Sequence, residues 1–474
     1  MKSQKTLINI SQKTFITVTV FLLVLLAFSI VLTFVIPAGT FGTNPDGTAD
    51  YAQYSLLKGV KGIPIWEGIL APFLVFASGD GLTLIMLSLF LLTISAAFQV
   101  MNDVGGIGAL VGSVSERFRD RKQLMTAVIS LLFMCFGAFL GLFEEMLTML
   151  PIVTVLCLAV GYDSFTGFLI CIISCGFGFA SAVTNPFTVL LACQIIGANP
   201  MEHIWYRLII FIVMYLLLQG FIALYLRRIG KNPESSYTYE HDLRIRETAS
   251  LESSPANAAD MKKTKTVYAV FLIISLVLIA VCSFTEALRG YTVPVLIAYF
   301  LIFGILAGML CAAEKKTVLK SFLNGFTGAL PTIVFIGLSA SIKYVFDEGH
   351  IMPTIANSIN TLAQGKNIFL IALIVYAIVL VLEFFISSST AKAILVMGLL
   401  STLNLGLSDQ LSMLIYTFAD GYTNVLFPTS PVLLISLSMI EMDYFKWVKR
   451  SVPLFATNLA LVILFILLGI VIKY

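Results

Sequence analysis

The sequence has few charged residues: Asp, Glu, Lys and Arg make up 12% of its 474 residues, while 59% are hydrophobic. Soluble domains carry about 25% charged residues, so the composition excludes an ordinary soluble protein. Long apolar runs recur along the chain, and many approach the ~20 residues that a helix needs to cross a bilayer. Because these runs do not alternate with polar residues, they argue against a β-barrel. The composition therefore predicts an all-α polytopic membrane protein.

Residue types that build common catalytic and metal centres are also scarce. The three histidines, His203, His241 and His350, lie at span ends or in a polar segment, which leaves no evident proton relay. The seven cysteines all fall in apolar segments, where a small buried hydrophobic role is the plain interpretation. The sequence has no phosphate-binding glycine loop, Ser-His-Asp pattern or zinc spacing. We expect no enzyme, no cofactor and no bound metal beyond Na+ as a coupling ion.

Seven runs predict plain spans, at about 14–36, 80–101, 204–226, 267–285, 291–311, 327–346 and 452–473. The first follows a lysine-bearing N-terminus but is too long for a signal peptide, so we expect it to be retained. Four other apolar segments are interrupted: 123–160 by Glu144-Glu145, 165–197 by Thr184-Asn185-Pro186, 368–404 by "SSST" and 411–440 by "PTSP". Broken backbone at membrane depth must face protein or a water-filled cavity, because lipid offers it no hydrogen bonds.

One polar stretch, 227–266, divides the chain. It is rich in charge and serine and predicts a solvated cytoplasmic linker. Residues 1–226 would then form a first repeat, and residues 267–474 an extra span with a second repeat. The segments 105–118 and 351–364, which precede 123–160 and 368–404, predict short interfacial helices.

The two halves are related by a constant offset. "TNPFTVLLA" at 184–192 aligns with "TSPVLLISL" at 429–437, 245 residues later, and the same offset pairs Gly176 with Gly421. The positive-inside rule places the Lys/Arg clusters in the cytoplasm and the C-terminus outside. Two full crossings and a re-entrant hairpin at 123–160 fit the charge distribution equally well, and the paired Glu at the turn favours the hairpin. We therefore expect re-entrant hairpins at 123–160 and 368–404. Five crossings separate them, so the second repeat is inverted. Inverted repeats with broken helices are typical of secondary transporters.

The polar residues at the hairpin tips and helix breaks are the candidate site, because helix ends at membrane depth offer free amides and carbonyls to ligands. We expect the substrate-binding residues to be Glu144, Glu145, Thr148, Thr184, Asn185, Thr188, Ser387, Ser388, Ser389, Thr390, Asp420, Asn424, Thr429 and Ser430. Candidates for binding a coupling ion, Na+ or H+, are Glu145, Asn185, Asp420 and Thr429. For the Ser and Thr residues, hydrogen bonding between helices is the alternative role.

Charged groups inside spans are functional candidates by default. Lys392 is expected either to serve the site or to form an internal ion pair with Glu144 or Glu145. Glu383 and Lys343 also lie at membrane depth, with less reason to touch substrate. The site is net acidic, which suits an amino acid with a cationic group better than a wholly anionic substrate.

Several stretches together resemble one family. "FVIPAGTFG", "GLFEEMLTMLPIV", "GYDSFTG", "TNPFTV", "FFISSSTAKA" and "FADGYTNVLFPTSPVLL" resemble the YfcC-like branch of the anaerobic dicarboxylate carrier (DcuC-type) family over nearly the whole chain. The resemblance implies an elevator-type ion-transporter fold with a scaffold that is usually dimeric. Related transporters carry Ser-Asn-Thr motifs at the two tips, from which Thr184-Asn185-Pro186, Thr429-Ser430-Pro431 and Glu144-Glu145 depart.

These observations predict a secondary active transporter, an ion-coupled symporter or an exchanger, in the bacterial inner membrane. Its substrate would be a small amino-acid-like metabolite, such as arginine or ornithine. A carrier of C4-dicarboxylates or other organic anions is the alternative, and a channel is the alternative from another class. The partners expected are the substrate, the lipid bilayer and a second copy of the chain, without nucleic acid.

Overall fold

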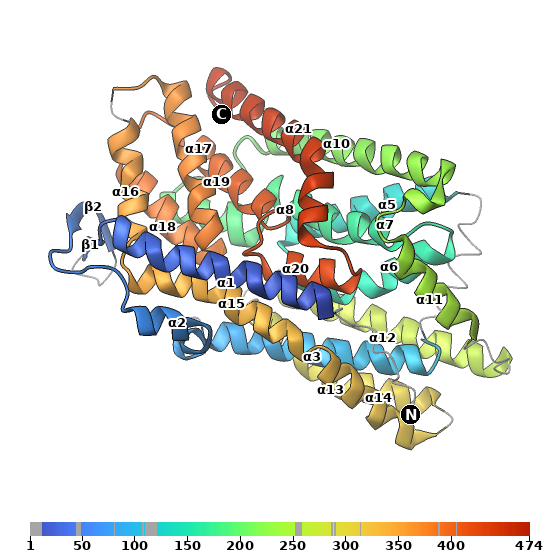
Figure 1. Cartoon of the computed structure of the whole chain (residues 1–474). Coiled ribbons are helices and arrows are strands. Elements are labelled where there is room, and N and C mark those ends of the chain that lie inside the picture. Colours follow the sequence, from blue (N-terminus) through green and yellow to red (C-terminus); the bar gives the residue numbers. More distant parts are fainter. Residues whose placement is uncertain are drawn as a thin grey trace.

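The computed structural model describes residues 12–43, 49–79, 81–106, 109, 121–251, 258–285, 288, 291–312, 314–363, 365–386, 389–403 and 405–474. Almost all regular structure in these ranges is helical, as Figure 1 shows. Seven helices there are long and apolar enough to cross a membrane by length and composition. The predicted class, a multi-pass helical membrane protein, is confirmed.

The seven predicted spans are all present as helices. They are α1 (Gln12–Val35), α3 (Gly81–Asp103), α10 (Ile204–Lys231), α12 (Ala258–Phe284), α13 (Thr292–Cys311), α15 (Leu330–Glu348) and α21 (Tyr444–Val471). Large apolar side chains on their outer faces are exposed, Val24 of α1 at 60% and Leu224 of α10 at 67%. Such faces suit a hydrocarbon environment, where apolar surface needs no protein cover.

The interrupted segments are helix pairs and broken helices, as predicted. In the first half, α5 (Lys122–Cys135) continues as the π-helical turn η2 (Phe136–Leu140), and the short η3 (Glu144–Thr148) leads into α6 (Leu150–Ala159). In the second half, α17 (Ile368–Phe385) is followed by α18 (Ser389–Thr402). Gly141, which ends η2, has φ +68°, a left-handed conformation that glycine adopts without strain.

Each broken helix is interrupted where its proline motif predicts. The first consists of α7 (Ser164–Phe168), η4 (Leu169–Ile173) and α8 (Ser174–Ala180), then a break, then η5 (Pro186–Leu190) and α9 (Leu191–Ile196). The second consists of α19 (Asp409–Thr423), a break, and α20 (Pro431–Met439). Every residue of α8, and every residue of α19 after Asp409, is buried, so these two helices form the centre of the core.

Four elements were not predicted. The strands β1 (Gly39–Thr43) and β2 (Ala49–Leu56) form an antiparallel pair after α1. The helix α2 (Ile65–Leu74), which continues as the short η1 (Val75–Ala77), precedes α3, and α14 (Lys315–Gly328) precedes α15. The predicted interfacial helix at 351–364 is present as α16 (Met352–Ala363), whereas most of 105–118 lies outside the described residues.

The predicted solvated linker needs correction. Its first residues belong to α10 and its last to α12, and between them lie η6 (Pro233–Ser235) and α11 (Tyr239–Leu251). Asp242 of α11 is 4% exposed and accepts a hydrogen bond from the backbone amide of Ser164 at 3.2 Å. Burial raises the pKa of the Asp242 carboxyl. The linker therefore packs on the helical body through a buried polar contact, which its polar composition did not indicate.

The two ends of the molecule are distinct. The β1–β2 pair lies at one end and α11 at the opposite end (Figure 1). The C-terminal residue Tyr474 contacts Tyr206, at the start of α10, with ring centroids 4.7 Å apart. Since α10 runs from there to the linker, the C-terminus lies at the end away from α11.

Candidate functional site

The two broken helices cross at the centre of the molecule through glycines. A Cβ atom on Gly421 of α19 would lie 2.1 Å from the Cα of Ala180, the last residue of α8. On the other side of the crossing, a Cβ atom on Gly176 would lie 2.2 Å from the Cγ1 of Val425. Because both helices break just after these residues, the crossing brings the two breaks close together.

Beside this crossing lies a buried cluster of three charged side chains: Glu383 near the end of α17, Lys392 in the first turn of α18 and Asp420 on α19. The Lys392 ammonium contacts the Glu383 carboxylate and lies 2.5 Å from Asp420 Oδ1. All three side chains are at most 1% exposed. The predicted ion pair with Glu144 or Glu145 is therefore wrong, because Lys392 pairs with carboxylates of its own half.

Polar groups next to the cluster hold Asp420 in place. The Ser389 hydroxyl, at the start of α18, donates to Asp420 Oδ2 at 2.9 Å, and the Tyr416 hydroxyl donates to the Ser389 carbonyl at 2.6 Å. The Asn424 amide donates to the Asp420 carbonyl at 2.9 Å, which stabilises the end of α19 at the break. These contacts unite three predicted site residues, Ser389, Asp420 and Asn424.

The cluster carries a net charge of −1 when all three groups are ionised. Lys392 balances one carboxylate, and the other is left without a counter-charge in the cluster. Glu383 Oε1 is buried and has no hydrogen-bond partner in the described part of the chain. An uncompensated charge in a low-dielectric interior costs several kcal/mol, so the arrangement favours an additional positive charge.

The first break is held by the first hairpin. The Asn185 side chain donates to the Gly137 carbonyl of η2 at 3.2 Å and accepts from the Phe187 amide at 2.9 Å. The Thr184 hydroxyl donates to the Phe139 carbonyl at 3.4 Å. Two predicted site residues, Thr184 and Asn185, therefore donate hydrogen bonds to backbone carbonyls of the first hairpin. This is the alternative role that polar groups at such a position can have.

Other predicted residues lie at the starts of the helices that follow the breaks. Thr188 is fully buried, and its hydroxyl has no hydrogen-bond partner among the described residues. Thr429 and Ser430 are each 7% exposed, and Ser430 caps α20 by accepting from the Leu433 amide at 3.4 Å. These hydroxyls lie close to free helix ends, where a ligand carboxylate could bind.

The final helix closes the second break. The Trp447 indole donates to the Val425 carbonyl at 3.0 Å, and the Tyr444 hydroxyl donates to the Leu426 carbonyl at 3.0 Å. These carbonyls follow the end of α19 and would otherwise lack partners. Neither aromatic residue is among the predicted site residues, although two aromatic donors in and just before "KWVKR" are a possible signal of a capping role.

The two carboxylates at the first hairpin tip are more exposed than those of the buried cluster. Glu144 is exposed and Glu145 half-buried, and Glu145 Oε2 accepts from the Phe143 amide at 3.3 Å. These residues are therefore not brought into the ion cluster. The side chains of Thr148 and Thr390 are not among those described, and Ser387 and Ser388 lie outside the described residues.

From the sequence, Glu383 has less reason to touch substrate than the hairpin tips, but the structure places it in the cluster. The available signal was its isolation: it is the only charged residue of α17, an 18-residue apolar helix. It also lies nine residues before Lys392, across the turn of a helix pair. An acidic and a basic residue flanking such a turn are well placed to meet.

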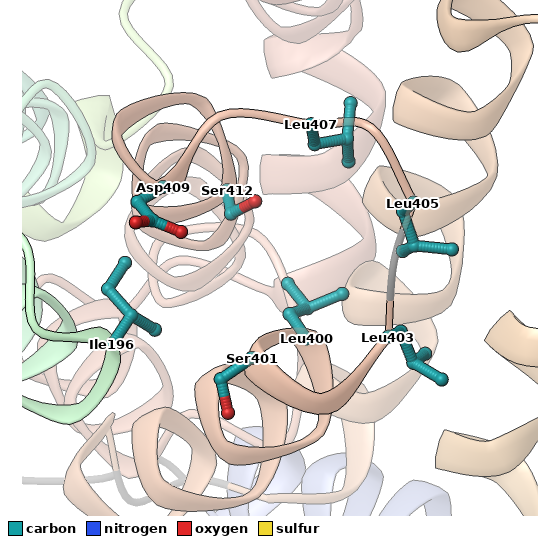
Figure 2. Close-up of a pocket in the computed structure, with 8 residues that line it drawn as sticks. All are labelled: Ile196, Leu400, Ser401, Leu403, Leu405, Leu407, Asp409 and Ser412. Atoms are coloured by element: carbon teal, nitrogen blue, oxygen red, sulfur yellow. The ribbon is translucent and has the colours of Figure 1, made fainter.

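A cavity of about 90 Å³ lies away from the cluster, where α18, α19 and α9 approach one another. Figure 2 shows mostly leucine side chains around it, with Asp409 and Ser412 on the α19 side. Asp409 is about three helical turns from Asp420 along α19. The cavity is therefore separate from the charged site.

Comparison with known proteins identifies relatives over most of the chain. The sequence model of a family described as "C4-dicarboxylate anaerobic carrier" matches residues 13–471. The chain is 26% identical over 428 residues to an Escherichia coli (strain K12) protein named "Putative basic amino acid antiporter YfcC", across 87% of this chain and 82% of that protein. It is 22% identical over 369 residues to an uncharacterized Haemophilus influenzae protein, across 77% and 71% of the two chains.

Two solved transporter structures also align with the chain. The Alcanivorax borkumensis YdaH transporter is 14% identical, with a TM-score of 0.43, and the alignment covers 96% of this chain and 99% of that one. Neisseria gonorrhoeae MtrF, described within a class of antimetabolite efflux pumps, is 15% identical, with a TM-score of 0.42 and coverage of 95% and 94%.

Proposed function

This chain belongs to the C4-dicarboxylate anaerobic carrier family, and we propose that it is a secondary active transporter that exchanges a cationic amino acid, such as arginine or ornithine. The observation that supports this proposal is the buried cluster of Glu383, Lys392 and Asp420, which has a net charge of −1 when all three groups are ionised. A positively charged group of the substrate would supply the missing counter-charge. The name of the Escherichia coli relative supports the same substrate class.

The remaining predicted residues would bind the other groups of such a substrate. The N-termini of η5 and α20, next to Asn185 and Ser430, offer amides and hydroxyls to the α-carboxylate. Thr188 and Thr429 lie in the first turn of η5 and just before α20. Glu144 and Glu145, at the first hairpin tip, would attract the cation as it enters.

We propose that the protein moves its substrate by an elevator mechanism. Two units, each with a helix pair and a broken helix, would form inverted repeats that move together against the outer spans. The glycine contact between α8 and α19 supports a joint movement, because it locks the two broken helices together. The location would be the bacterial inner membrane, with the N-terminus cytoplasmic and the C-terminus outside. The assembly would be a homodimer, and the coupling ion H+ or Na+.

One observation favours a second candidate, a carrier of C4-dicarboxylates. Lys392 is a buried cation beside the breaks, and the matching family is described by that substrate class. A dicarboxylate would have to displace both carboxylates from Lys392, which the net negative charge opposes. A channel is disfavoured because the two broken helices pack closely at their crossing, through Gly176 and Gly421.

Uptake by purified protein in liposomes tests the proposal. Liposomes preloaded with unlabelled arginine are expected to accumulate labelled arginine and ornithine by counterflow, with saturation, and to exclude succinate. Protein-free liposomes are the control. An absence of arginine and ornithine flux would contradict the proposal, succinate counterflow would favour the dicarboxylate carrier, and non-saturating conductance would favour a channel.

A further inference from the structure

We infer that Glu383 is the group that carries the counter-transported proton, and that Lys392 occupies the place of a metal cation, so that exchange is proton-linked and independent of sodium. This inference rests on the proposed function and specifies its coupling ion. It differs from the expectations drawn from the sequence, which assigned the coupling ion to Glu145, Asn185, Asp420 or Thr429.

The two carboxylates of the cluster differ in how well they are satisfied. Asp420 Oδ1 contacts the Lys392 ammonium at 2.5 Å, and Asp420 Oδ2 accepts from Ser389 at 2.9 Å. Glu383 Oε2 contacts Lys392, whereas Glu383 Oε1 is buried with no partner among the described residues. The free oxygen belongs to Glu383, so a proton added to the cluster gains most by binding there.

The other ionisable groups around Glu383 leave this role to it. Lys392 comes from α18, Asp420 and Tyr416 from α19, and Tyr376 from α17 itself. Of the other helices that pack on α17, α16 has no titratable residue. On α15, Lys343 lies 3.7 Å from Asp347, and α21 carries charge only in its first two turns. No second cation in the described chain is thus placed to balance the cluster.

The geometry opposes a sodium ion. Hard cations collect several oxygen ligands around one point. Here the space between the two carboxylates is taken by the Lys392 ammonium, which contacts both. A proton needs only one oxygen, and Glu383 Oε1 supplies it.

Charge balance in the cluster then predicts how many protons are exchanged for each substrate molecule. The cluster is neutral with one added positive charge, either a proton on Glu383 or the cationic group of the substrate. With neither, one negative charge is left buried, and with both, one positive charge is in excess. Both states are costly in a low-dielectric interior. The unit would therefore cross the membrane with one or the other, which exchanges one proton for one cationic substrate.

Measurement on the wild type tests coupling directly. Protein in liposomes that contain a pH-sensitive dye is expected to move protons out as arginine enters. A pH gradient, acid inside, should increase arginine uptake at least tenfold over the rate without a gradient. The rates in sodium chloride and choline chloride should agree within twofold. Uptake that requires sodium, or arginine entry without proton movement, would overturn the inference.

Variants locate the proton. Glu383→Gln is neutral, like the protonated cluster, so it is expected to lose the tenfold response to the pH gradient and the dye signal. Arginine counterflow should slow as well, because bound substrate would then leave one positive charge in excess. Glu383→Asp, which keeps a carboxyl, should retain both responses at a lower rate. Glu67→Gln on α2 is the matched control, because its carboxylate bonds to Tyr344 outside the cluster, at 2.9 Å. It should behave as the wild type.

The outcomes separate the two proposals. Proton movement that persists in Glu383→Gln would overturn the assignment of Glu383 while leaving arginine exchange intact. Counterflow without any pH response in the wild type would overturn proton coupling alone. An absence of counterflow in the wild type would overturn the proposed function and, with it, this inference. If Glu383→Gln does not fold, the wild-type measurements and Glu383→Asp still decide.

Discussion

The two helix-pair units place their charge at different positions. At positions 245 residues apart, the first unit has Ala138, Leu147 and Cys175 where the second has Glu383, Lys392 and Asp420. All six are buried. At the tips the pattern is reversed, because Glu144-Glu145 of the first unit corresponds to Ser389-Thr390 of the second.

This difference indicates what the buried charges are for. Cys175 and Asp420 both bond to their own helix pair: the Cys175 thiol donates to the Leu142 carbonyl at 2.6 Å, and Asp420 accepts from Ser389. The first unit therefore keeps the same packing with an apolar trio. Since apolar replacement of buried ion clusters is often neutral or stabilising, packing does not explain the charges of the second unit. Function does.

The largest effect is expected when only one of the three charged residues of the second unit is replaced by an apolar residue, as in the first unit. Lys392→Met would leave two buried carboxylates facing each other, at a cost of about 3–5 kcal/mol in the free energy of unfolding. The triple variant Glu383→Gln, Lys392→Met, Asp420→Asn should recover most of that loss and yet show no proton-driven uptake. Unfolding in detergent, followed by tryptophan fluorescence, measures the stability of both variants, and the liposome assay measures uptake.

Leu147→Met, at the corresponding position of the first unit, is the control for Lys392→Met. It conserves volume and should cost less than about 1.5 kcal/mol. If Lys392→Met proved as stable as Leu147→Met, the buried cluster would not be ionised as described.

The second-largest effect concerns the glycine pair at the crossing. Gly421→Ala would place a methyl group against the Ala180 backbone, which cannot move independently of α8. Gly176→Ala, 245 residues earlier, would meet only the Val425 side chain, which can rotate. We expect about 3 kcal/mol of destabilisation for Gly421→Ala and about 1 kcal/mol for Gly176→Ala, and a loss of transport for the first alone.

Gly220→Ala on α10 is the control, because no atom lies within 4 Å of the added methyl group. It should stabilise the helix by about 0.5–1 kcal/mol. Equal destabilisation by the Gly176 and Gly421 variants would contradict the difference in their neighbours. Chemical unfolding in detergent compares all three.

Sequence patterns predicted most of the fold, and physical reasons explain the exceptions. The seven spans and both breaks follow from apolar length and from proline, which act locally. The β1–β2 pair and α14 are short elements outside the hydrocarbon-length runs, so length gave no signal for them. The docking of α11 depends on Asp242 meeting Ser164, a contact between residues far apart in sequence.

The candidate site was also predicted only in part, because some of its contacts join residues whose meeting the sequence does not reveal. Ser389, Asp420 and Asn424 were found because polar residues at membrane depth are conspicuous. The partners of Lys392 were not, since sequence spacing does not reveal which carboxylate a lysine reaches across a helix pair. The character of the hairpin tips groups Glu144 and Glu145 with Lys392, whereas in the structure Lys392 pairs with Glu383 and Asp420 of its own half.

A smaller effect tests the two breaks. Asn185, fully buried, makes two hydrogen bonds, whereas Ser430, at the corresponding position, makes one long bond to the Leu433 amide. Asn185→Ala should cost about 2 kcal/mol, because it removes a cap and one of the hydrogen bonds to the Gly137 carbonyl, which also accepts from the Gly141 amide at 3.2 Å. Ser430→Ala should cost about 0.5 kcal/mol. Unfolding in detergent compares them, and a larger cost for Ser430→Ala would contradict the assigned roles.

The smallest effect concerns the linker helix, which contacts both halves. While Asp242 bonds to Ser164 of the first half, Arg244 pairs with Glu441, between α20 and α21, and His241 lies 3.4 Å from the same carboxylate. The hydrogen bond with His241, with help from Arg244, lowers the pKa of Glu441 below its ordinary 4.5. Glu441→Gln should cost about 0.5–1 kcal/mol at pH 7, as expected for a partly exposed pair.

The pH dependence of the stability tests whether the ionised Glu441 carboxylate causes that effect. Because the pKa of Glu441 is lowered in the folded state, its contribution is fully present above pH 4.5 and is lost as the pH falls through the lowered value. Thermal unfolding of wild type and Glu441→Gln should therefore differ above pH 4.5 and converge in acid. Glu234→Gln, an exposed carboxyl on η6, should match the wild type throughout. A difference that grew in acid would show that the linker is held to the second half by something other than the Glu441 carboxylate.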